Sequence, residues 1–458
     1  MRARVGAVLI GSARRLHARW KAEPLVRNSA YLMLTTVVNG AVGYVYWIVA
    51  ARLGTTTEVG VATAAIAILF LTSMATNLGI GPALIQALPR VGHDDRRWSS
   101  MVNASIVVAF AAGVVGSAIV ATTLPMVLPR FDAVLRSPFP FAMFVLGAGL
   151  FSATLIADCV FVSERRGARM LVRNIVFALG KLALIVVPVL LGMRLSASVI
   201  VTSFVLGTVM SLGVALVQLH GLGRTYRRTL AGGAEAWRAL RGNLAAHHLT
   251  WLGANLPQYV LPPIVVARLT ASDNAFFSMA WTVGGVFFTV SPAAAAALFV
   301  EGASSQDRLG RSTRKSAVLI TGLLGPAMLV FLLFGSQIMR LFGAEYSRPT
   351  QTLLRILVVS AIPDGVTNLY TSVLRVRRRI RTAAALNLFM AVVALGGAWI
   401  LLPRLGVSGA GWAWITAQTL GALVVGVLVL RDRRATPVQV VVQAVEPAPL
   451  AMASMSSA

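Results

Sequence analysis

The chain of 458 residues is strongly hydrophobic: 57% of its residues are apolar or aromatic, only 12% are charged, and the mean hydropathy is +0.78. Few soluble domains have this composition, and repeated apolar runs of about 20 residues predict an all-α integral membrane protein. The net charge of +26 alone would also suit a nucleic-acid-binding protein, but the placement of the basic residues explains it without nucleic acid. The single cysteine, Cys159, excludes an intramolecular disulfide, and no metal-ligand spacing is present. We therefore expect no metal and no cofactor.

Taken in order, the chain predicts twelve transmembrane spans between two polar ends. Residues 1–28 form a basic N-terminus, and the first six spans fall at about 29–51, 60–84, 100–124, 139–161, 174–192 and 197–219. A basic connection, residues 220–244, leads to spans at about 245–267, 274–299, 316–335, 350–372, 383–402 and 407–430. Residues 431–458, rich in Val, Ala, Pro and Ser, predict a disordered tail.

The basic residues are distributed unevenly between the two sides of the predicted membrane. The N-terminus, the tail and alternate loops carry 31 of the 41 Lys and Arg residues, and the other loops carry eight. Basic loops stay on the cytoplasmic side, so both termini are predicted to lie in the cytoplasm, in a multi-pass protein of the inner (plasma) membrane. The same basic face would attract anionic membrane lipids.

Two short sequence matches predict an internal duplication. Ala51-Arg52-Leu53 resembles Ala267-Arg268-Leu269 at a shift of 216 residues, and the run ending at Arg194-Leu195 resembles the run ending at Arg404-Leu405 at a shift of 210. Repeats that both start inside are related by an axis along the membrane normal. We therefore expect two six-helix bundles, residues 29–219 and 245–430, related by pseudo-two-fold symmetry around a cavity. Arg52 and Arg268 would be structural anchors that extend to the outer interface.

Charged residues inside the predicted spans are candidates for function, because each costs several kcal/mol unless it is paired or hydrated. Asp158 and Lys181 fall at similar depth on adjacent antiparallel spans, so they predict either an ion pair that holds the bundle together or groups that face a cavity. Arg355 and Asp364 share one span but lie on opposite faces. Lys181 and Arg355 are candidates for binding an anionic substrate group. Asp364, near the midplane, and Asp158 are candidates for ion coupling, or alternatively for packing.

Neutral polar groups mark a second set of candidates for substrate binding. Asn39 lies in the first span, and Asn255, Gln258 and Tyr259 lie in the proline-containing stretch from Asn255 to Leu269. Such amide and phenol groups suit sugar hydroxyls and helix–helix contacts equally well.

Several stretches resemble one family of membrane proteins. They are Ala51 to Gly60 (ARLGTTTEVG), Leu256 to Pro263 (LPQYVLPP), Phe276 to Trp281 (FFSMAW), Ala297 to Gly302 (ALFVEG) and Leu405 to Trp414 (LGVSGAGWAW). With them the chain resembles the polysaccharide-biosynthesis and O-antigen flippases of the multidrug/oligosaccharidyl-lipid/polysaccharide (MOP) exporter superfamily. The resemblance implies that the chain, which is not an enzyme, moves a polyprenyl-diphosphate-linked oligosaccharide from the inner to the outer leaflet. It also implies polysaccharide polymerase and glycosyltransferase partners.

A second function stays open at this point. Cation-coupled multidrug efflux antiporters belong to the same superfamily and often place an acidic residue in the first span, whereas residues 29–51 contain none. A flippase would need a cavity cationic enough for a diphosphate, and an antiporter for cationic drugs would need one rich in carboxylates. Lys181 and Arg355 favour the first, and Asp158 and Asp364 keep the second open.

Overall fold

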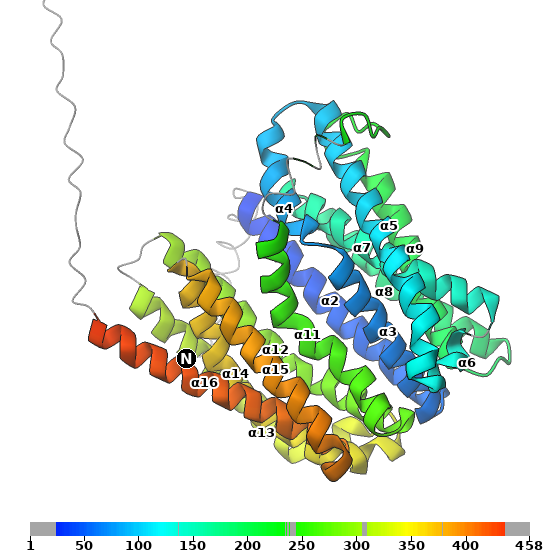
Figure 1. The fold of residues 1–458 in the computed structure, drawn as a ribbon, viewed down its shortest axis with the longest axis vertical. Helices are drawn as coiled ribbons and strands as arrows, with labels where there is room; N and C mark the ends of the chain where they lie inside the picture. The colour runs from blue at the N-terminus through cyan, green and yellow to red at the C-terminus, as the bar shows by residue number, and fades with distance from the viewer. Residues whose placement is uncertain are drawn as a thin grey trace, which may run out of the picture.

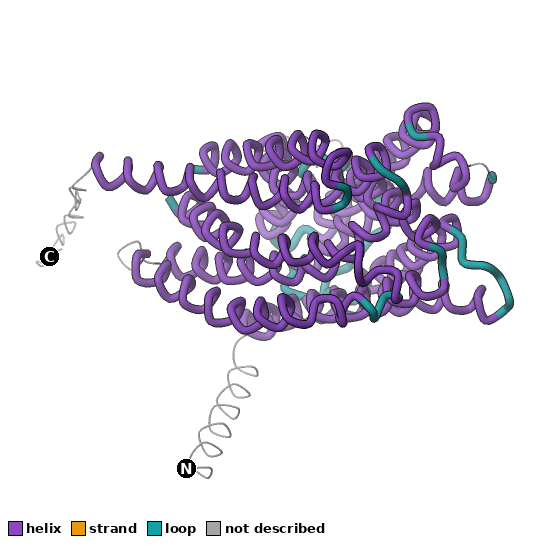
Figure 2. The backbone as a smooth tube through the Cα atoms, turned by 90° about the horizontal axis from the view of Figure 1, so that it is seen from below, coloured by secondary structure: helices purple, strands orange, loops and turns teal. Residues whose placement is uncertain are grey.

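The structure, a computed structural model, describes residues 24–435 apart from 136, 234, 236–237, 239–243, 305–308 and 378. Most of the basic N-terminus and of the predicted disordered tail lies outside the described residues. Within them the chain is helical almost throughout, and its only bridge between extended residues joins Gly54 to Leu195 (Figures 1 and 2).

The helices form two bundles that follow each other along the chain. The first contains α2 (Pro24–Leu53), α3 (Thr56–Thr76), α4 (Ile80–Ala87), α5 (Asp95–Val127), α6 (Asp132–Leu135), α7 (Pro138–Ser163), α8 (Gly167–Leu190) and α9 (Ala197–Leu219). The short 3₁₀ turns η1 (Leu88–Val91) and η2 (Pro129–Phe131) interrupt it. The second contains α11 (Leu244–Arg268), α12 (Ala271–Ser304), α13 (Leu309–Met339), α14 (Ala344–Val376), α15 (Ile380–Leu405) and α16 (Ser408–Ala435).

All twelve predicted spans are present as helices, which confirms the predicted fold class. Nine helices in the described part of the chain are long and apolar enough to cross a membrane. The span predicted at 60–84 is wrong as one continuous helix, because α3 ends at Thr76 and α4 starts at Ile80. Leu78 and Gly79 between them have φ angles of 53° and 75°, in the left-handed region that a right-handed helix cannot include.

The second bundle repeats the packing of the first. α2 packs on α8 as α11 packs on α15, and α7 packs on α9 as α14 packs on α16. Across the junction, the Thr56 hydroxyl donates to the Ser272 hydroxyl at 3.1 Å. These two residues are 216 positions apart, the same offset that relates Arg52 to Arg268. Under two-fold symmetry only residues at the axis contact their own equivalents, so the pseudo-axis passes close to this hydrogen bond.

The described part of the connection between the bundles packs on the first bundle, at the end that the sequence predicts to face the cytoplasm. The Arg224 guanidinium donates to the Gly92 carbonyl at 2.7 Å, lies 3.4 Å from the Glu164 carboxylate and sits 5.6 Å from the Trp98 ring centroid. The Tyr226 hydroxyl donates to the Asn103 side chain at 2.6 Å. Residues 222–233 therefore move with the first bundle.

Candidate functional site

The two bundles touch most closely at the end where α2 and α11 end and α3 and α12 begin, which we call the closed end. The Asn274 amide on α12 donates to the Gly60 carbonyl at 2.7 Å and to the Thr63 hydroxyl at 3.0 Å on α3. A Cβ atom on Gly60 would lie 1.7 Å from the Ala271 carbonyl oxygen. The backbones are thus in direct contact, and only glycine fits at this point of α3.

Two arginines at the edge of the closed end form hydrogen bonds between the bundles. Arg52, at the end of α2, donates to the carbonyls of Leu341 at 2.7 Å and Arg340 at 3.2 Å. Arg130 donates to the carbonyls of Val266 at 2.9 Å and Leu269 at 2.8 Å. These carbonyls belong to the C-terminal ends of α13 and α11, where the helix dipole favours a positive charge.

Arg268 occupies the repeat position equivalent to Arg52 but makes a different contact. Its guanidinium lies 4.6 Å from the centroid of the Trp399 ring on α15, within the second bundle. Of the two predicted anchors, Arg52 therefore bridges the bundles, and Arg268 packs inside one.

A cavity of about 690 Å³ lies between α2, α3, α11 and α12. Its wall combines aromatic rings with hydroxyl and amide groups. The rings belong to Tyr44, Trp47, Phe70, Tyr259, Phe277 and Trp281. Its size and its mixture of apolar surface with a few polar groups are typical of small-molecule binding sites.

The cavity is closed on one flank and open on the other. α3 packs along α11, and there the Phe70 and Tyr259 rings stack with centroids 5.5 Å apart. α2 and α12 scarcely touch, and the Tyr44 hydroxyl donates to the Thr282 carbonyl at 2.5 Å. Beyond it, Val37 on α2 and Val286 on α12 line the cavity while being 65% and 41% exposed. Val37 lies thirteen residues into α2, about 20 Å from its start, so this opening is at mid-membrane depth.

No described residue that lines the cavity carries a charge. The sequence of the four lining helices agrees, because it contains no Asp, Glu, Lys or Arg at residues 28–51, 59–76, 244–267 or 274–300. Asn39, Gln258 and Tyr259 line the cavity as predicted candidates, whereas Asn255 is not among the lining residues. Lys181 and Arg355 do not line it either, and Arg355 is exposed on α14. The described wall is therefore neither the cationic cavity that a flippase was expected to need nor the carboxylate-rich one expected of an antiporter.

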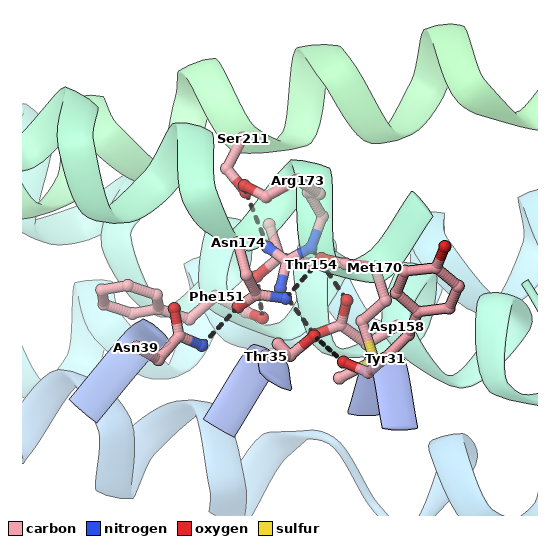
Figure 3. A network of polar contacts seen from close by, with 10 residues as sticks. All are labelled: Tyr31, Thr35, Asn39, Phe151, Thr154, Asp158, Met170, Arg173, Asn174 and Ser211. Carbon is pink, nitrogen blue, oxygen red and sulfur yellow. Dashed lines mark hydrogen bonds and ion pairs between the residues drawn. The ribbon is translucent and has the colours of Figure 1, made fainter. Parts of the chain in front are cut away.

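The predicted pairing of Asp158 with Lys181 is wrong, because Asp158 pairs with Arg173. The Arg173 guanidinium donates to both carboxylate oxygens, at 2.8 and 2.5 Å, and to the Ser211 hydroxyl at 2.7 Å (Figure 3). The predicted span began at residue 174, so the prediction treated Arg173 as a loop residue outside the membrane. Helix α8 begins at Gly167, which places Arg173 inside the bundle, facing α7.

This ion pair is linked to the cavity through two amides. Asn174, the neighbour of Arg173, accepts a hydrogen bond from the Asn39 amide at 2.8 Å and donates to the Met170 carbonyl at 2.8 Å (Figure 3). Asn39 belongs to the cavity wall. The network therefore joins α2 to α7, α8 and α9, and Asp158 itself stays behind the wall.

Lys181 is enclosed by aromatic rings in place of a carboxylate. Its ammonium lies 4.8, 4.7 and 4.4 Å from the ring centroids of Tyr46, Phe177 and Phe204. The residue is 6% exposed. Ring faces attract a desolvated cation, so the three rings stabilise this buried charge. Only Phe177, four residues before Lys181 on α8, could have been predicted from sequence spacing, because Tyr46 and Phe204 come from two other helices.

Asp364 lies inside the second bundle, on α14, and is 4% exposed. Close by, the Thr367 hydroxyl donates to the Gln418 side chain on α16 at 3.1 Å, and the Asn368 amide donates to the Asp364 carbonyl at 3.0 Å. Asp364 is not among the residues that line the cavity. Neither it nor Asp158 belongs to a cluster of metal-ligating side chains, since the described residues contain no group of three His, Cys, Asp or Glu suited to a metal.

Comparison with known proteins relates the chain to one fold. The MatE family pattern matches residues 259–400, in the second bundle. An inward-facing multidrug resistance MATE family transporter of the MOP superfamily superposes with a TM-score of 0.67 at 15% identity, covering 89% of this chain and 98% of that one. The lipid II flippase MurJ, in an inward closed conformation, gives 0.68 at 10% identity, covering 87% of each chain. An outward-facing MATE transporter gives 0.60 at 17% identity, covering 90% of this chain and 95% of that one. No curated protein sequence matches the chain. The chain thus has the two-bundle fold of MATE transporters and of MurJ.

Proposed function

We propose that the chain is a transporter of the MOP superfamily that moves a polyprenyl-diphosphate-linked oligosaccharide between membrane leaflets by alternating access. The fold supports transport, because transporters built from repeats place the substrate near the midplane, between the two halves. The neighbours in structure are described as transporters and a flippase, and none as an enzyme. The expectation that this chain is not an enzyme agrees with them.

The observation that carries the choice of substrate is the cavity with its opening between α2 and α12. A polyprenyl tail is too apolar to enter a polar cavity, so a flippase for such a lipid needs a gap through which the tail stays in the hydrocarbon. Val37 and Val286 border such a gap at mid-membrane depth. The aromatic, hydroxyl and amide wall suits sugar rings, which offer apolar faces and hydroxyl edges.

The diphosphate of this substrate would stay outside the cavity, at head-group level. Lys181 is enclosed by rings and Arg355 is exposed on α14, so neither is available at the wall. The membrane face opposite the closed end is the predicted basic face, and such residues attract phosphate groups. We accordingly place the closed end outside and both termini in the cytoplasm.

Multidrug efflux remains the second candidate, favoured by the MatE match over residues 259–400 and by the fold of MATE transporters. The described cavity wall speaks against cationic drugs, because it offers no carboxylate. Asp158 and Asp364, the acidic groups at membrane depth, lie inside the bundles and are proposed to couple ion movement to transport.

A leaflet assay tests the proposal. Purified protein is reconstituted into liposomes with a fluorescent polyprenyl-diphosphate oligosaccharide, and a membrane-impermeant quencher measures the fraction in each leaflet. We expect protein-dependent exchange, which Tyr259→Ala should slow and Trp399→Ala, outside the cavity, should leave intact. No exchange of the lipid, together with expulsion of a cationic dye, would replace the flippase by the antiporter.

A further inference from the structure

We infer that the cavity selects glycans without charge: neutral sugars in preference to acidic sugars, amino sugars or cationic drugs. The inference rests on the proposed function, since it concerns the glycan that the same cavity would hold. It assigns the flippase a class of glycan, and it identifies Gln258 as a position where one substitution would change that class.

The first observation is the complete lack of charge on the lining helices at membrane depth. No Asp, Glu, Lys or Arg occurs at residues 28–51, 59–76, 244–267 or 274–300, which include every described residue that lines the cavity. A charged head group that enters would give up part of its hydration without gaining a counter-charge. A buried charge without a partner is strongly unfavourable.

The second observation concerns what lies behind the wall. The Lys181 ammonium is 4.4 Å from the Phe204 ring centroid, and that ring is 6.0 Å from the ring of Phe70, which lines the cavity. The positive charge of Lys181 therefore lies behind the cavity wall, separated from it by the Phe204 ring. The carboxylate on the adjacent helix α7, Asp158, is already held by Arg173. This arrangement repels cations.

The aromatic rings of the wall also pack against other aromatic rings. Phe70 stacks on Phe151 at 4.6 Å and on Tyr259 at 5.5 Å. The Trp281 ring has Phe277 at 5.4 Å and Trp414 at 5.1 Å. Rings packed in this way do not form the open cage that binds a quaternary ammonium group.

The third observation is a buried acceptor behind the wall. Asn39 lines the cavity, its amide nitrogen donates to Asn174, and its oxygen Oδ1 is buried without a hydrogen-bond partner in the described chain. No donor offsets the partial negative charge of this oxygen, so it disfavours a carboxylate on the cavity side of the wall. Anionic glycans are therefore disfavoured as well.

Three matched amphiphiles test the inference without requiring transport. A dodecyl glucoside, the corresponding glucuronide and the 6-amino-6-deoxyglucoside differ only at C6, which carries a hydroxyl, a carboxylate or an ammonium group. Binding to the protein in nanodiscs is followed by tryptophan emission, and the double variant Trp47→Phe, Trp281→Phe shows which part of the signal comes from the cavity. We expect the glucoside to bind at least tenfold more tightly than either charged analogue. Equal binding of the three, tighter binding of a charged one, or no binding of the glucoside would overturn the inference.

Substitutions at Gln258 provide a second test of the inference. This exposed side chain lines the cavity on α11, and Gln258→Glu keeps its shape while adding a negative charge. Gln258→Glu should raise affinity for the amino analogue, and Gln258→Lys that for the glucuronide, each at least tenfold. The same substitutions at Gln337, exposed near the end of α13, should change neither. If the Gln258 variants bind the three amphiphiles as the wild type does, the cavity does not select by charge.

The two proposals can fail separately. Selective binding of the glucoside without exchange of the fluorescent lipid would remove the flippase and leave the selectivity. Exchange of the lipid with equal binding of the three amphiphiles would remove the selectivity and leave the flippase.

Discussion

Gly60 is the position at which the smallest change should have the largest effect on the opening of the closed end. A Cβ atom there would lie 1.7 Å from the Ala271 carbonyl oxygen and 2.6 Å from its carbon, both backbone atoms that cannot rotate away. Inserting a methyl group into a packed contact costs about 1 to 3 kcal/mol. Since the clash exists only while the bundles touch, the cost falls on the closed form alone. At about 1.4 kcal/mol per factor of ten, Gly60→Ala should shift the equilibrium toward a form in which the closed end is open by roughly 5- to 140-fold.

Spin labels across the closed end measure this shift. Leu53 at the end of α2 and Leu341 beyond α13 are exposed and lie beside the Arg52 contact, so labelled cysteines there, in a Cys159→Ala background, report the separation of the bundles. Gly60→Ala should add a longer distance population. Gly396→Ala, on α15 where a Cβ atom meets nothing within 4 Å, is the matched control and should not. A folded Gly60→Ala protein with the wild-type distance distribution would show that this contact does not hold the end closed.

Three other outcomes are expected. Arg173→Met should destabilise the protein by about 3 to 5 kcal/mol, because Asp158 is then buried without its partner; Asp158→Asn added to it should restore much of the loss in thermal unfolding. Asp364→Asn should keep the fold and abolish gradient-driven exchange of the lipid, and wild-type exchange would assign Asp364 to packing. Acidification below about pH 4 should loosen the docked connection. The N–H of Thr225 donates to Asp95 and lowers the pKa of that carboxyl, so its contribution is complete above the unfolded pKa and is lost as pH falls through the folded one. Hydrogen exchange at Thr225 measures this loss.

The number and order of the helices could be predicted because each reports its own composition, whereas their ends could not, as the start of α8 at Gly167 shows. An apolar run of sufficient length must form a helix in lipid, whatever its neighbours, since its backbone groups have no other partners there. The break at Leu78 and Gly79 could not be predicted, because the run continues through it and only the backbone angles reveal it. The offset between Arg52 and Arg268 did predict the repeat, since Thr56 and Ser272 meet at the same offset.

The candidate site was harder to predict, because side-chain partners depend on rotation about each helix axis. Position along the helices placed Asp158 at the same depth as Lys181. The direction in which each side chain points from its helix determined that Asp158 pairs with Arg173. The lack of charge on residues 28–51 and 244–267 was readable from the sequence and proved more informative than the charges themselves, since every lining helix shares it. Which helices line the cavity is a property of the packed bundles, so that pattern had no meaning before the fold was known.

The arginine contacts at the closed end limit what can operate this gate. Arg52 and Arg130 hold backbone carbonyls, and neither a guanidinium nor a peptide carbonyl changes its protonation at any pH that a cell meets. Acid therefore does not release these two contacts directly. The carboxylates at this end, Glu58 and Asp273, accept hydrogen bonds from Ala197 in the first bundle and Thr270 in the second, so each is held within one bundle. A proton gradient, if it drives the cycle, would then act on carboxylates away from the arginine contacts and reach the closed end mechanically, as a change of helix position.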